Sequence, residues 1–190
     1  MTNETEQLLR RIRLGEDSTL ELERVVVSGH RVADPSRDAM SDELAAFANS
    51  RAASGTVVLG VDDKSREVLG IPLEHLDVVE TWLRQICNDS IDPPLAASIR
   101  KLELADRSGV LVPVIRVDVS RSLFVHQSAG GFYQRIGSSK RKLAMEALTR
   151  LLQERSQTRV IRFDESPVPR TSPEELDVAR AARFMRARLA

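Results

Sequence analysis

The stretch that most constrains this chain is residues 45–71, AAFANSRAASGTVVLGVDDKSREVLGI. Its run TVVLGV is too apolar to face water, which predicts a buried strand. The residues before this run are typical of a helix end and a turn relieved by glycine. The residues after it indicate a tight Asp-Asp-Lys-Ser turn and a return strand, EVLGI. Two carboxylates, Asp62 and Asp63, are therefore expected where a buried strand emerges into solvent.

Periodicity and turn signals place the other elements around this strand. A polar loop is expected at residues 28–36, and a Gly-Ser turn at residues 137–139 is expected to open a helix. A linker at residues 157–170, with a strand at 159–163, is expected to precede a further helix that starts at the capping sequence Ser-Pro-Glu-Glu, residues 172–175. The remaining predictions are helices at residues 4–14, 36–49, 75–87 and 140–155, and strands at residues 18–27, 96–104, 110–119, 123–126 and 132–136.

These elements predict an α+β fold, with a mixed, largely antiparallel sheet and helices packed on it. The expected organisation is an N-terminal helix at residues 1–14, a domain at residues 15–156, and a linker with a C-terminal helix at residues 157–190. The 190 residues are 42% hydrophobic and 4% aromatic, which indicates an aliphatic core. No run approaches the ~20 apolar residues of a spanning helix, and the N-terminus lacks a signal-peptide core, so a cytoplasmic protein without membrane contact is expected.

Charge is distributed unevenly although the net charge is zero. Residues 1–95 carry 10 basic and 18 acidic side chains, and residues 96–190 carry 18 basic and 10 acidic ones. Either the two halves neutralise each other across the fold or a subunit interface, or a basic phosphate-binding surface lies beside an acidic metal pocket. The single Cys87 excludes an internal disulfide and a multi-cysteine zinc site.

Two local patterns suggest chemistry. The alternation Leu-Glu-Leu-Glu at residues 20–23 puts Glu21 and Glu23 on one face of a strand, as in many half-exposed strands. Basic side chains cluster at the predicted start of the helix at residue 140. Their positive charge is unfavourable beside the positive end of the helix dipole unless a bound anion neutralises it. This second pattern indicates a phosphate contact or a solvated charge cluster, formed by Arg135, Lys140, Arg141 and Lys142.

Three segments together resemble the Schlafen AlbA-type domain family over about residues 14–155. The AFAN segment, a glycine and the strand ending GVDDKSREVLGI are similar to its hallmark, and GFYQRIGSS at residues 131–139 is similar to its GxYxRxGSS segment. Gly15-Glu16 and residues 20–23 resemble its GE…EFK entry strand. The chain departs from the family in carrying Glu23 where the family has Lys, and in replacing N-T-x-G-G by residues 49–55.

The resemblance implies nucleic-acid binding, first as a DNA-binding transcriptional regulator. A second implication is a metal-dependent RNase, in which Glu16, Glu21 and Asp63 would be catalytic and, together with the neighbouring Asp62, would bind magnesium or manganese. A nucleotide (ATP)-binding module is the third, although GVDDKS lacks the glycine spacing of a Walker A loop. No zinc is expected. The residues implied to contact nucleic acid are Arg135, Ser138, Ser139, Lys140, Arg141 and Lys142.

A homodimer is also expected. Larger Schlafen proteins pair two similar lobes, and this chain supplies one lobe together with a C-terminal helix that has an apolar stripe.

Overall fold

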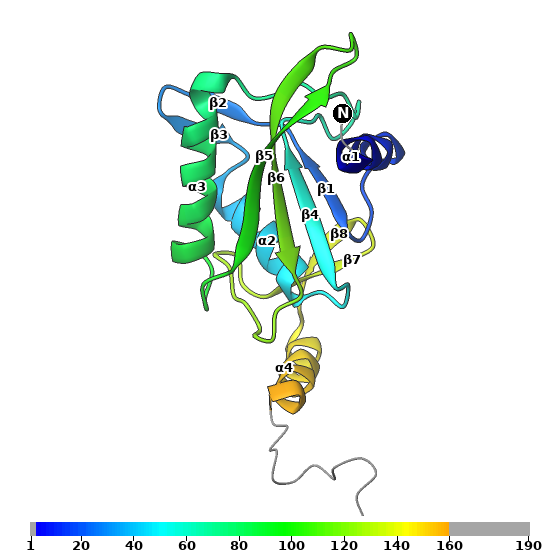
Figure 1. Ribbon diagram of the computed structural model, residues 1–190. Helices are drawn as coiled ribbons and strands as arrows, with labels where there is room; N and C mark the ends of the chain where they lie inside the picture. Colours follow the sequence, from blue (N-terminus) through cyan, green and yellow to red (C-terminus); the bar gives the residue numbers. More distant parts are fainter. Residues whose placement is uncertain (1–2, 160–190) are drawn as a thin grey trace, which may run out of the picture. The chain divides into compact units, whose positions relative to one another are not determined.

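The computed structural model of this protein describes residues 3–159 (Figure 1). The chain divides into two compact units, residues 1–156 and residues 157–190. The predicted strand at residues 159–163 and the helix expected from Ser172 lie outside the described residues. In the described part, no helix is long and apolar enough to cross a membrane.

The main sheet has four strands in the order β1-β4-β6-β5. The strands β1 (Leu20–Glu23) and β4 (Ser54–Leu59) are parallel, and Glu21 lies opposite Val57. Antiparallel pairs join β4 to β6 (Leu111–Ser120) and β6 to β5 (Ala97–Ala105). The sheet is therefore mixed and largely antiparallel, and the α+β prediction is confirmed.

The buried strand β4 contributes side chains to two separate cores. Val57 and Leu59 belong to a cluster with α2 (Arg37–Asn49) and α3 (Leu76–Asp89), which follows the 3-10 turn η1 (Leu73–His75). Val58 belongs to a second cluster with α1 (Asn3–Leu14). Figure 1 shows α1 on the opposite side of the sheet from α2 and α3. Because both faces of β4 are covered, its sequence is apolar at consecutive positions.

A separate two-stranded sheet replaces the loop predicted at residues 28–36. It pairs β2 (Val26–Ser28) with β3 (Arg31–Asp34), and Gly29 adopts a φ of +62° between them. Val27 and Val32 pack against the core cluster of α2 and α3. This burial explains why the apolar run after residue 24 leaves the main sheet.

The predicted helix at residues 140–155 begins later than expected. Residues 139–142 form β8 (Ser139–Lys142), which pairs with β7 (Tyr133–Ile136), and the helix α4 spans Met145–Arg159. Gly137 at φ +62° lies between the two strands and reverses the chain, as in a tight β-hairpin. The predicted strands at residues 123–126 and EVLGI are also absent, and the second segment contributes only the bridge from Val61 to Val68.

Candidate functional site

The polar face of β1 is the starting point of the site. Leu20 and Leu22 are buried in the core, and the alternation of the strand places Glu21 and Glu23 on its other face, half-buried. This arrangement confirms the period-two prediction. A third glutamate, Glu43 of α2, is 3% exposed and lies against the same region.

Arg135 of β7 occupies the centre of these carboxylates. Its side chain is 1% exposed, and its Nη2 atom donates to Glu21 Oε2 at 2.5 Å while its Nη1 atom donates to Glu43. The guanidinium also lies 4.6 Å from the centre of the Phe47 ring, a cation–π contact. Its remaining hydrogen bonds go to the backbone carbonyls of Asp17, Leu20 and Ser138.

Lys140 of β8 adds a second cation from the same hairpin. Arg135 and Lys140 are opposite each other in the β7–β8 register, so their side chains share one face. Lys140 Nζ donates to the carbonyl of Ala39 at 3.0 Å and lies 3.4 Å from Glu43 Oε2. The hairpin is thus anchored to α2 by two cations that converge on one buried glutamate.

The carboxylate cluster, defined as Glu16, Glu21, Glu23 and Glu43, outnumbers these two cations. Burial and then the charge of Glu43 raise the pKa of Glu21 to about 8 and that of Glu23 to about 7. Burial also raises the pKa of Glu16, whose Oε1 accepts from the backbone N–H of Leu22 at 3.2 Å. The raised pKa of Glu21 favours its protonated form at neutral pH.

The two aspartates that follow β4 differ in their surroundings. Asp62 Oδ1 accepts from the backbone N–H of Lys64 and Ser65 and from the Ser65 hydroxyl, at 2.7–3.2 Å, and these bonds lower its pKa. Asp63 is exposed, and its charge contributes to raising the pKa of Glu16. Asp62 therefore closes the turn, and the two N–H groups it binds are not free to cradle a phosphate.

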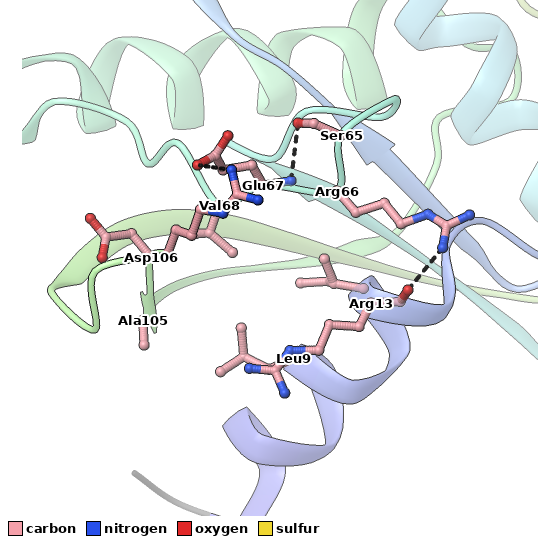
Figure 2. A pocket seen from close by; sticks show the side chains of 10 residues that line it. Leu9, Arg13, Ser65, Arg66, Glu67, Val68, Ala105 and Asp106 are labelled. Atoms are coloured by element: carbon pink, nitrogen blue, oxygen red, sulfur yellow. Dashed lines mark hydrogen bonds and ion pairs between the residues drawn. The ribbon is translucent and has the colours of Figure 1, made fainter.

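Figure 2 shows how the same turn is tied to its neighbours around a cavity of about 290 Å³. Arg66, at φ +59°, reaches back to donate to the carbonyl of Arg13 at 2.9 Å. Glu67 lies 3.9 Å from the guanidinium of Arg107. Arg66 and Arg107 therefore point to separate partners.

The predicted metal ligands do not form a metal site in the arrangement that the structure gives them. Within residues 3–159, no group of three or more His, Cys, Asp or Glu side chains is placed to hold a metal ion. Glu21 is bound to the Arg135 guanidinium, and Asp62 is bound to its own turn.

The structure divides the predicted nucleic-acid-binding residues into two groups. Arg135 and Lys140 point inward to the carboxylate cluster, so Arg135 is inaccessible to a phosphate, contrary to the expectation. The residues that remain exposed on the hairpin are Ser138, Ser139, Arg141 and Lys142.

Glu43 is the site residue that the sequence analysis missed. It lies three residues after Met40 and four before Phe47, both of which are buried on the apolar stripe of α2. A glutamate on the apolar face of a helix needs a buried partner for its charge. The spacing of Glu43 from Met40 and Phe47 was therefore the signal that could have identified it.

A sequence model of the Schlafen AlbA_2 family matches residues 16–144. The chain belongs to this family. The matched residues include the carboxylate cluster, the turn after β4 and the β7–β8 hairpin, and they end just before α4.

Among solved structures, the DIP2311 protein from Corynebacterium diphtheriae is similar at 18% sequence identity and a TM-score of 0.48. The similarity covers 66% of this chain and 25% of that protein. This chain therefore spans about a quarter of the length of that relative. No curated protein matches the sequence.

Proposed function

We propose that this protein binds nucleic acid through the exposed side of the β7–β8 hairpin. Family membership supports the ligand class, and the exposed side chains of Arg141 and Lys142 support the position. Within residues 3–159, neither of these two side chains forms an ion pair with a carboxylate. Their charge is therefore available to phosphates, whose neutralisation releases counterions.

The internal contacts of the hairpin explain how it can present these charges. A hairpin with two strands of four residues each is too short to be stable alone, but Arg135 and Lys140 fix one of its faces to α2. The turn at Gly137 then places Ser138 and Ser139 at the exposed end, where hydroxyl groups can donate to phosphate oxygens. Arg141 lies on the opposite face of the hairpin from Lys140, and Lys142, at the end of β8, shares the face of Lys140 but is exposed. The hairpin therefore combines a fixed attachment to α2 with two exposed cations that a phosphate can reach.

The test measures fluorescence anisotropy of labelled tRNA and labelled duplex DNA with the Arg141→Ala/Lys142→Ala double variant. We expect weaker binding and a salt slope smaller by about 1.4 log units for single strands or about 1.8 for duplex DNA, because two phosphate contacts are lost. The matched control is Lys64→Ala/Arg10→Ala, which removes the same charge from exposed positions distant in sequence. Equal affinities for the two double variants would contradict the proposed surface.

The same assay separates the narrower functions. A transcriptional regulator should prefer duplex DNA with a defined sequence over tRNA. A metal-dependent RNase is the second candidate, and the excess of carboxylates around β1 is the observation that favours it. It would require Glu21 to exchange the Arg135 guanidinium for a metal ion. Adding manganese to the tRNA samples and separating the products on a gel tests this candidate, and intact tRNA would rule it out for that substrate.

A homodimer stays a prediction, since the C-terminal helix that motivated it lies outside the described residues. Light scattering at tens of micromolar protein measures it directly, and a monomeric mass would exclude it.

A further inference from the structure

We infer that a cavity between α3 and the β2–β3 turn is a stacking site for an unpaired base of single-stranded nucleic acid. This inference rests on the proposed nucleic-acid binding and adds the place where a base is held. The cavity has a volume of about 510 Å³, and its walls include Trp82 of α3, Arg31 of β3 and Arg37 of α2. These residues bring an aromatic surface and two cations together.

Trp82 supplies the stacking surface. It is the only tryptophan in the chain, and it is half-buried because it packs against the core cluster of α2 and α3. The core holds the side chain in place, and Trp82 is also part of the cavity lining. A fixed aromatic surface of this kind stacks any base, since every base has a π-face.

Arg31 supplies charge for a phosphate beside the base, and Arg37, which is paired with Asp89, adds guanidinium N–H donors. Arg37 Nε donates to Ser90 Oγ at 2.8 Å and the guanidinium lies 3.8 Å from Asp89, so its orientation is fixed. Arg31 is exposed at the β2–β3 turn, and it has no ion-pair partner within the part of the chain that the structure describes. The acidic member of the lining, Asp77, is bound to Lys101 at 2.6 Å.

The polar side chains next to Trp82 can form hydrogen bonds with the edge of any base. Thr81 and Gln85 are four residues apart on α3 and both line the cavity. A hydroxyl and an amide can each donate and accept a hydrogen bond, so neither selects one base strictly. Bases inside a duplex are already stacked and paired, which makes a single strand the fitting ligand.

The cavity and the β7–β8 hairpin are connected through α2. Arg37 is the first residue of this 13-residue helix, and its last residue, Asn49, donates to the carbonyl of Tyr133 in β7 at 2.9 Å. A helix of this length spans about 20 Å. A single strand of several nucleotides can therefore reach both places at once.

The single tryptophan makes the site observable by its own emission. The protein is titrated with a fluorescein-labelled oligouridylate of about 12 nucleotides, within the range that single-strand binders cover. Anisotropy of the label and emission of Trp82 are recorded together, with N-acetyltryptophanamide as the correction for absorbance. We expect Trp82 emission to be quenched with the same apparent Kd as the anisotropy change.

Three variants test the assignment of roles. Trp82→Leu should weaken binding by about 5- to 150-fold, the usual range for loss of one stacked base, and Trp82→Phe should weaken it less. Arg31→Ala should lower the salt slope by about 0.7 log units. Phe124→Leu and Lys64→Ala are the matched controls, because each removes an exposed ring or charge outside the cavity lining.

The outcomes separate this inference from the proposed function. An anisotropy change without quenching, together with wild-type affinity of Arg31→Ala, overturns the stacking site but leaves nucleic-acid binding intact. Quenching of Trp82 emission by duplex DNA but not by oligouridylate also overturns the stacking site. Absence of any anisotropy change with oligouridylate, tRNA and duplex DNA overturns both. If Trp82→Leu fails to give a folded circular dichroism spectrum, wild-type quenching and Arg31→Ala decide the question.

Discussion

Replacing Glu21 by Gln should remove part of the dependence of stability on pH. The pKa of Glu21 is raised from an ordinary value near 4.5 to about 8, first by burial and then by the charge of Glu43. Between these two values the folded protein binds a proton that the unfolded chain lacks. The free energy of unfolding must therefore fall as pH rises through this window. Gln resembles a glutamate that is always protonated, so the variant has no such proton to lose.

The structure sets the size of this effect. For a pKa that moves from about 4.5 to about 8, the linkage relation gives a loss of about 2.5 kcal/mol between pH 5.5 and 7.5. Because the Glu21 side chain is 15% exposed, water screens part of this, and we expect about 1 to 2 kcal/mol. Burial lowers the pKa of His126, so this residue makes the free energy of unfolding rise with pH, and it does so in wild type and variant alike.

The assay is urea unfolding followed by circular dichroism at several pH values from 5.5 to 7.5. The quantity of interest is the difference in slope between wild type and Glu21→Gln, in which the contribution of His126 cancels. Glu74→Gln, at an exposed position in η1, measures the effect of removing one surface carboxylate. Parallel pH dependences of Glu21→Gln and wild type would refute the reasoning that Glu21 holds a proton in the folded state.

Two further substitutions test the interior of the domain. Arg135→Met should lower the free energy of unfolding at pH 7.5 by about 3 to 5 kcal/mol, because buried Glu43 loses its cation and Glu21 loses its hydrogen-bond donor. Thermal unfolding measures this, and a loss below about 1 kcal/mol would show that the pair contributes little. Gly55→Ala should abolish or severely reduce soluble expression, because its Cβ would lie 1.9 Å from the Phe47 ring. A wild-type melting temperature for Gly55→Ala would mean that Phe47 can move aside.

The main sheet and α2 could be predicted from the sequence because their signals are local. The apolar run of β4, the Ser36 cap and the alternation of β1 each depend on residues close together in the chain. The acidic and basic halves of the chain also contact each other within the fold, since Glu21 and Glu43 of the acidic half pair with Arg135 of the basic half.

The β7–β8 hairpin and the partners of Arg135 could not be predicted because they depend on tertiary contacts. The sequence from Ser139 onward is compatible with a helix start, and only the docking of Lys140 onto α2 favours the strand. Likewise, Glu43 and Arg135 are 92 residues apart, and nothing in either segment indicates the other. Local patterns thus located the charged residues but not the direction in which their side chains point.

The β2–β3 hairpin has a consequence for how this domain can vary. It forms its own two-stranded sheet within the connection between the parallel strands β1 and β4, and it shares no strand pairing with either. Residues can therefore be inserted or exchanged at its turn without altering the β1–β4 register that positions Glu21. One wall of the Trp82 cavity is thus a replaceable module, and turns of different length and composition can be grafted there while the carboxylate cluster keeps its geometry.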